Sequence, residues 1–365
     1  MRVLFFVGEQ RWSGSARTFL AAARGLAKRG HDVTIACCDS SRIARLSSAA
    51  GLHTVAIDRS VTTAGTTWDV RSILQERMVE VAFVFTERDQ LIVSSAMRLA
   101  ERAGVVRRVP SFEHIDLENS GRLSLRIAAC GLLFSTDREA HDVEAPGWVI
   151  PAAVAPLGVD APSYDAIRPV SRDDIDVPPQ GMLVACIYEP SGRQRLATLF
   201  RTMAFIGPRH PDLRIVVVGP GSRDEELRLH AAAVGVNSII NFVGDREDQL
   251  SVLRAASVGW VVAGDDGGAY GCLDLMALRI PIIAERSALT QHYVAAGISG
   301  VLLAPGDAAR TASAVAAFLA HEDRRTAMGN AGRTRVQRDF TESAMVDGFE
   351  KAALAAADRA NWATR

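Results

Sequence analysis

Short apolar runs alternate with segments of helical periodicity along most of this 365-residue chain. Residues 3–7 are apolar throughout, and residues 15–29 then carry apolar side chains at helical spacing on one face. Gly30 closes that segment, as glycine commonly does after a helix, and residues 33–37 form the next apolar run. A strand, a helix and a second strand in this order usually pair their strands in parallel. The pattern therefore predicts an α/β fold built on parallel sheets.

The alternation continues to the end of the chain and divides into two series. Residues 160–180 separate the series, because they are rich in Asp, Pro and Ser and lack apolar periodicity, and we interpret them as a linker. Further strands are expected at residues 81–85, 131–134, 182–187, 214–218, 239–243, 258–262 and 281–284, and C-terminal helices at residues 308–319, 322–339 and 343–359.

A chain of this length is too long for one ordinary core and fits two domains. We expect residues 1–165 and residues 166–342 to form two doubly wound, Rossmann-like domains that face each other across a cleft. Residues 343–365 are expected to form a terminal helix that packs back on the first domain. Ligands of such sheets bind at the carboxyl ends of the strands, so the loops there are the places to look for a site.

Composition excludes several classes of protein. The formal net charge of -1 gives no basic field for holding nucleic acid. The five cysteines include no C-x-x-C pair, which indicates neither a disulfide framework nor a zinc site. No apolar run approaches the roughly 18 residues that a membrane-spanning helix needs. We therefore expect a cytoplasmic protein, with association at a membrane surface left open.

The most informative local sequence is Asp-Gly-Gly-Ala-Tyr-Gly-Cys-Leu-Asp at residues 266–274. It reads as a glycine-rich loop that runs into a helix, and Pro281 then opens a short buried strand. Such a helix start offers backbone N–H groups and the positive end of the helix dipole to a phosphate. Asp266 and Asp274 frame the loop and can hold two parts of one ligand. A nucleotide-sugar fits this arrangement, because its diphosphate suits the amides and its hydroxyls suit the carboxylates.

Other segments add weak motifs whose order and spacing are informative together. The chain carries Trp12-Ser-Gly14 before the first long helix, Pro156-Leu-Gly158-Val-Asp160 near the linker, and Val218-Gly-Pro-Gly221, Phe242-Val-Gly244 and Asp266…Asp274 in the second series. With these motifs, the chain resembles the group 1 (family four) glycosyltransferases, which are retaining enzymes of the GT-B fold. The last of the motifs stands where that family has Glu-x7-Glu.

The resemblance implies a reaction and a set of roles. A sugar, of the hexose type, would move from a nucleotide-sugar donor to an acceptor hydroxyl with retention of configuration. It would do so without a bound metal or other cofactor. The acceptor would be a glycan, a lipid-linked sugar or a small metabolite.

The same resemblance assigns residues. Gly14 would approach the diphosphate or the acceptor, His114 would lie near the transferring sugar and Asp266 would contact sugar hydroxyls. Asp274 would bind the ribose. The backbone amides of Gly267, Gly268, Ala269, Tyr270 and Gly271 would bind the phosphates, together with the guanidinium of Arg193 or Arg195.

Three departures from the family pattern bear on activity. Both acidic positions carry Asp where the family prefers Glu. The expected Arg and Lys pair falls near residues 188–196, where the chain has Arg193-Gln-Arg195 and no lysine. Arg279 replaces the glycine usual before the strand proline. These changes support an alternative, a catalytically weakened GT-B protein that binds a nucleotide-sugar or supports a partner enzyme.

Two other functions are disfavoured, and several of the named residues have plainer interpretations. The order of the motifs argues against a nucleotide-sugar epimerase, and the first loop lacks the G-x-G-x-x-G of a Rossmann dehydrogenase. Asp266 is a residue type that commonly caps a helix, and Gly14 suits a simple turn. A lone histidine such as His114 is usually structural.

Overall fold

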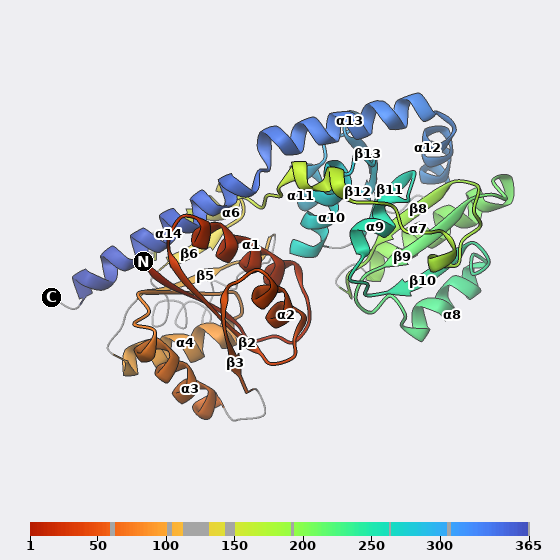
Figure 1. The fold of residues 1–365 in the computed structure, drawn as a ribbon. Helices are drawn as coiled ribbons and strands as arrows, with labels where there is room; N and C mark the ends of the chain where they lie inside the picture. Colours follow the sequence, from red (N-terminus) through yellow and green to blue (C-terminus); the bar gives the residue numbers. More distant parts are fainter. Residues whose placement is uncertain are drawn as a thin grey trace. The chain divides into compact units, whose positions relative to one another are not determined.

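The computed structural model describes residues 1–58, 63–100, 104–111, 131–142, 150–190, 193–262, 264–304 and 308–363. The chain divides into two compact units (Figure 1). Unit 1 comprises Met1–Gly158 and Glu342–Arg365, and unit 2 comprises Val159–Thr341. The residues expected to form a linker lie within unit 2, where they form two short 3-10 helices, η1 (Ala161–Ala166) and η2 (Asp173–Ile175).

The described strands of unit 1 form a seven-stranded parallel sheet in the order β3-β2-β1-β4-β5-β6-β7. The strand order reverses between β1 and β4, which makes this a doubly wound sheet. The strands are β1 (Arg2–Val7), β2 (Asp32–Cys38), β3 (His53–Ile57), β4 (Val81–Val84), β5 (Val105–Arg108), β6 (Gly131–Phe134) and β7 (Ala152–Val154). The described helices are α1 (Gly14–Lys28), α2 (Arg42–Ala49), α3 (Thr63–Glu76), α4 (Glu87–Leu99), α6 (Asp137–Asp142) and α14 (Glu342–Ala363).

Alternate residues of β1 point to opposite faces of this sheet, as the two-residue period of a strand requires. Leu4 and Phe6 join a core cluster with residues of α3 and α4. Phe5 lies on the other face, where its ring packs 5.1 Å from Phe19 of α1 and 6.0 Å from Phe349 of α14, between ring centroids. The last helix of the chain therefore completes one face of the first sheet.

Charged side chains also hold α14 against the first part of unit 1. Arg29 lies 2.5 Å from Asp347 and 2.6 Å from Glu350, measured between nitrogen and oxygen. His31 bonds the second oxygen of Glu350 at 2.7 Å. Hydrogen bonds from His31 and Arg29 hold the pKa of the Glu350 carboxyl below its usual value. Its stabilising contribution is therefore present at neutral pH and is lost as the pH falls through the folded-state pKa.

The described strands of unit 2 form a six-stranded parallel sheet in the order β10-β9-β8-β11-β12-β13. They are β8 (Leu183–Ile187), β9 (Arg214–Val218), β10 (Ile240–Gly244), β11 (Val258–Val261), β12 (Ile282–Glu285) and β13 (Gly300–Leu303). The described helices are α7 (Arg193–Ile206), α8 (Glu225–Val234), α9 (Gln249–Arg254), α10 (Asp266–Ala277), α11 (Ala288–Tyr293), α12 (Ala308–Ala320) and α13 (Glu322–Asp339), with a 3-10 turn, η4 (Gly207–Arg209), after α7.

The two faces of the second sheet are covered by different helices. Val184 and Trp260 belong to a core cluster that includes residues of α7 and α12. On the opposite face α10 packs closely, because a Cβ added to Gly259 of β11 would lie 2.2 Å from the Leu275 side chain. The expectation of an α/β fold with two doubly wound, parallel-sheet units is confirmed, and each listed strand of the sequence analysis appears within one or two residues of its predicted position.

The packing of α14 gives a first prediction. Phe349 is fully buried among Phe5, Phe19 and Phe83. Replacing it with alanine removes a large buried ring and leaves a cavity, so Phe349→Ala should lower the free energy of unfolding by about 3–5 kcal/mol. Denaturant unfolding followed by circular dichroism measures this change.

A control lies on the same helix. Leu354 is 49% exposed, so Leu354→Ala should change the free energy of unfolding by no more than about 0.5 kcal/mol. Equal effects of the two substitutions would contradict the assignment of α14 to the core of unit 1.

Candidate functional site

The loops that follow the central strands of unit 2 gather at the carboxyl edge of the sheet. Tyr188 follows β8, and its N–H donates to the Val218 carbonyl at 2.9 Å. Gly219 follows β9 with a φ of +132°, and a Cβ there would lie 2.0 Å from the Tyr188 carbonyl oxygen. Only glycine permits so close an approach of two backbones. The β8 and β9 loops are therefore packed together next to the start of α10.

The first turn of α10 is capped by Asp265 rather than by Asp266. The Asp265 carboxylate accepts a bond from the Gly267 N–H at 3.0 Å, and the Asp265 carbonyl accepts one from the Ala269 N–H at 3.0 Å. Asp266 is the first helical residue and is only 2% exposed. The cap that the sequence analysis weighed for Asp266 thus belongs to its neighbour.

The expectation that all five amides from Gly267 to Gly271 bind a phosphate is therefore too wide. The Ala269 N–H already donates to the Asp265 carbonyl, so the prediction that it binds a phosphate is wrong. Tyr270 is buried, and a Cβ on Gly271 would lie 3.2 Å from Ile187, so both residues serve the packing of α10 on the sheet. The Gly267 N–H already bonds the Asp265 cap, so Gly268 is the glycine whose N–H lies in the first turn without use in that cap.

Asp274 lies in the middle of α10 and is 1% exposed. Its Oδ1 accepts a hydrogen bond from the Tyr164 hydroxyl at 2.5 Å. A buried carboxylate without such a donor would be strongly destabilising. Tyr164 belongs to η1, so this bond ties the start of unit 2 to the helix behind the glycine-rich loop. The sequence analysis anticipated that Asp274 needs a partner, but it did not find Tyr164.

The two candidate arginines of α7 differ in their surroundings. Arg193 is exposed and lies 2.9 Å from Asp224 and 2.6 Å from Glu226, so its charge is compensated by α8 and its cap. Arg195 reaches the loop before α10, because a Cβ added to Gly264 would lie 2.7 Å from its Nη1. The residues predicted to form a glycine-rich loop lie in the first turns of α10, and Arg195 is the arginine placed beside that helix start.

A further cation at this edge was missed by the sequence analysis. Arg223 follows the Gly219-Pro-Gly221 motif, and a Cβ added to Gly244 at the end of β10 would lie 2.9 Å from its Nε. The signal available in the sequence was an arginine just after a glycine-rich turn that follows a strand. Arg195 and Arg223 thus bring positive charge to two loops of the same sheet edge.

In unit 1, Gly14 is the first residue of α1 and follows the cap residue Ser13. The Ser13 hydroxyl accepts a bond from the Ala16 N–H at 3.2 Å and donates to the Glu9 carboxylate. Gly14 accordingly lies at a helix start just beyond the carboxyl end of β1. His114, the other candidate expected in this part of the chain, lies outside the described residues.

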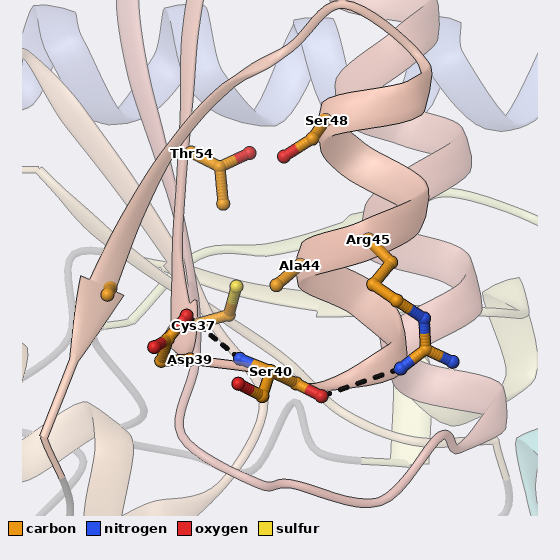
Figure 2. A pocket seen from close by; sticks show the side chains of 8 residues that line it. Cys37, Asp39, Ser40, Ala44, Arg45, Ser48 and Thr54 are labelled. Atoms are coloured by element: carbon orange, nitrogen blue, oxygen red, sulfur yellow. Dashed lines mark hydrogen bonds between the residues drawn. The ribbon is translucent and has the colours of Figure 1, made fainter.

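Unit 1 also contains a pocket that holds no residue predicted for the site (Figure 2). It has a volume of about 390 Å³ and lies between β2, α2 and the edge strand β3. Its lining consists of Cys37, Asp39, Ser40, Ala44, Arg45, Ser48, Thr54 and Ala56. Burial raises the pKa of the Cys37 thiol to about 11, so this sulfur is protonated at neutral pH and is a poor nucleophile.

The structure adds two negative findings. Among the described residues, no group of three or more His, Cys, Asp or Glu side chains is arranged to hold a metal ion. Within the same part of the chain, no helix is long and apolar enough to cross a membrane.

Comparison with known proteins shows that the region containing the site resembles a protein family. Residues 183–335 match the model of the family described as glycosyl transferases group 1. The D-inositol 3-phosphate glycosyltransferase of Corynebacterium kroppenstedtii is 26% identical over 276 residues, which cover 72% of this chain and 58% of that protein. A GDP-mannose-dependent monoacylated alpha-(1-6)-phosphatidylinositol monomannoside mannosyltransferase of Corynebacterium glutamicum is 25% identical over 51% of each chain. The chain thus spans 58% or less of the length of these relatives.

Solved structures give the same result for the fold. Anabaena HepE in complex with UDP-glucose superposes with a TM-score of 0.78 at 14% identity, over 96% of this chain and 98% of that one. The lipopolysaccharide glycosyltransferase WaaG superposes with a TM-score of 0.70 at 17% identity, over 97% and 99%. The fold is therefore GT-B, and residues 183–335 resemble the group 1 glycosyltransferases.

The buried bond between Tyr164 and Asp274 gives a second prediction. Tyr164→Phe removes the donor, and Asp274→Asn removes the charge that it compensates. Because each single change breaks the same interaction, the double variant should be more stable than the sum of the single effects predicts, with a coupling of about 1–3 kcal/mol. Denaturant unfolding of the four proteins measures the coupling. Additivity within about 0.5 kcal/mol would show that the hydroxyl does not support this carboxylate.

Proposed function

We propose that this protein is a retaining glycosyltransferase that moves a hexose from a nucleotide-sugar to an acceptor hydroxyl. The observation that carries the proposal is that the matched residues 183–335 contain the whole carboxyl edge of the second sheet, including the start of α10. Both relatives are glycosyltransferases, and the similar structure of HepE contains UDP-glucose.

In this proposal the donor diphosphate lies over the first turn of α10. The N–H groups of that turn and the helix dipole favour negative charge there. The guanidinium of Arg195 stands at the loop before α10 and would neutralise the diphosphate as it leaves, and Arg223 adds positive charge at the end of β10. Such neutralisation by side chains is the basis for proposing a reaction that needs no bound metal.

The two aspartates of α10 would bind the sugar and the ribose, the groups on either side of the diphosphate. Asp266 would contact sugar hydroxyls. Asp274 would reach the ribose only by sharing its carboxylate with Tyr164, because the Tyr164 hydroxyl already binds Oδ1. Gly14 would approach the diphosphate or the acceptor, and His114 would lie near the transferring sugar. We propose that the reaction takes place in the cytoplasm, with a glycan, a lipid-linked sugar or a small metabolite as acceptor.

The fold alone does not choose between reactions of nucleotide-sugars. A putative UDP-N-acetylglucosamine 2-epimerase from Listeria monocytogenes also superposes, with a TM-score of 0.65 at 12% identity. A transferase and an epimerase therefore have to be distinguished by the reaction that they catalyse. A transferase consumes donor only when an acceptor is present, whereas an epimerase converts the donor alone.

The test is a thermal-shift screen with UDP, GDP, ADP, dTDP and their common sugar conjugates, with and without magnesium. A ligand present at about 100 times its dissociation constant adds about 2.7 kcal/mol to stability, which shifts the midpoint clearly. Turnover with the preferred donor and candidate acceptors follows, with product configuration read by NMR. Inversion of configuration would refute the retaining mechanism, and binding without any turnover would support the catalytically weakened alternative.

The arginines supply a third prediction with a matched control. Arg195→Ala should weaken binding of the preferred nucleoside diphosphate about tenfold, because a charge-assisted contact is lost. Arg193→Ala removes the same charge from the same helix, but Arg193 is already paired with Asp224 and Glu226. We expect its effect on affinity to be less than about twofold. Titration calorimetry measures both, and equal losses would contradict the proposed position of the diphosphate.

A further inference from the structure

A third carboxylate, Glu189, lies against the first turn of α10. A Cβ added to Gly267 would lie 2.5 Å from Glu189 Oε1, 2.7 Å from its Cγ and 2.8 Å from its Cδ. The end of the Glu189 side chain therefore rests on the Gly267 backbone. Glycine at position 267 is what leaves room for it.

The backbone that carries Glu189 is fixed on two sides. The Tyr188 N–H donates to the Val218 carbonyl at 2.9 Å, and the Val262 N–H donates to the Ile187 carbonyl at 3.2 Å. Pro190 follows and restricts the conformation of Glu189 itself. The main chain next to Glu189 is thus held in place, and the carboxylate lies beside Gly267.

A carboxylate is favoured at this place for the same physical reason as a phosphate. The first N–H groups of a helix carry partial positive charge, and α10 is a helix of 12 residues. Glu189 is half-buried, so its charge is less screened than that of a fully exposed side chain. A phosphate brought to the first turn would meet the negative charges of Glu189 and of the capping residue Asp265.

We propose that Glu189 acts as an internal competitor of the donor diphosphate. This inference rests on the proposed function, since it assumes that a diphosphate binds over α10. The carboxylate occupies the first turn in the ligand-free protein and must rotate away when the donor binds. Glu189 then lowers the affinity for every ligand in proportion to the negative charge placed at that turn, and it leaves the affinity for an uncharged nucleoside unchanged.

The proposal differs from a purely structural role in its dependence on ligand charge. Glu189→Gln keeps the size of the side chain and removes its charge. For the base preferred in the thermal-shift screen, we expect this variant to bind the nucleoside diphosphate about tenfold more tightly than the wild type, the size of one unit-charge interaction near a protein surface. Affinity for the corresponding nucleoside should not change. Titration calorimetry with nucleoside, monophosphate and diphosphate measures the trend.

Two further variants make the experiment decisive. Glu189→Ala removes both the charge and the bulk, and should give at least the gain of Glu189→Gln. Glu225→Gln is the control, because Glu225 is an exposed residue at the start of α8 and its substitution changes the net charge of the protein equally. It should leave all three affinities at their wild-type values.

The outcomes separate this inference from the proposed function. A gain that grows from nucleoside to diphosphate in both Glu189 variants supports internal competition. Diphosphate binding that is equal in wild type and Glu189→Gln overturns it and leaves the proposed donor site standing. A gain of equal size for the nucleoside also overturns it, because a charge effect cannot act on an uncharged ligand. Failure of wild type and variants alike to bind any diphosphate overturns both ideas.

Discussion

The backbone N–H groups at the start of α10 are the constraint on which the chemistry of unit 2 depends. They cannot bond within the helix, so they require acceptors from elsewhere. Asp265 supplies one acceptor, and the Glu189 carboxylate lies over the same turn. The position is therefore occupied by the protein's own negative charges before a ligand arrives. A ligand that binds there meets these negative charges, whereas the cations that would favour it lie at the loop before α10, for Arg195, and at the end of β10, for Arg223.

The sequence predicted the sheets well where their strands are buried on both faces. Such strands are continuous apolar runs, as in β8 and β9, and they cannot be mistaken for loops. The strands not predicted have a different composition. The edge strand β3 is mostly exposed or half-buried, β7 is three residues long, and β5 ends in Arg107 and Arg108. Those two arginines are buried in spite of their charge, which no hydrophobic pattern could indicate.

The candidate site was predicted in its location more than in its contacts. Gly267 and Gly268 could be recognised from the sequence, because glycine is the residue type that allows a ligand or another chain segment to approach the backbone closely. Which of two adjacent aspartates caps the helix depends on one backbone dihedral pair, and Asp265 rather than Asp266 has the extended conformation. Arg193 and Arg195 are also indistinguishable in the sequence. Only the fold places Asp224 beside the first and Gly264 beside the second. The Tyr164 bond spans 110 residues and had no local signal.

One departure from the family pattern, Arg279, differs in its physical effect from the charge that Glu189 places beside α10. Arg279 adopts a φ of +60°, the conformation that favours glycine, and its side chain bonds Asp165 at 3.0 Å. Asp165 also receives a bond from the buried Arg333 at 2.8 Å, and the hydrogen bond from Arg279 helps to hold the pKa of Asp165 below its usual value. This departure thus has a structural compensation within unit 2. Glu189 has a different consequence, because it places negative charge where the proposed donor needs positive charge. Arg279 therefore bears on the fold of unit 2, whereas Glu189 bears on the affinity of the proposed site for a charged donor.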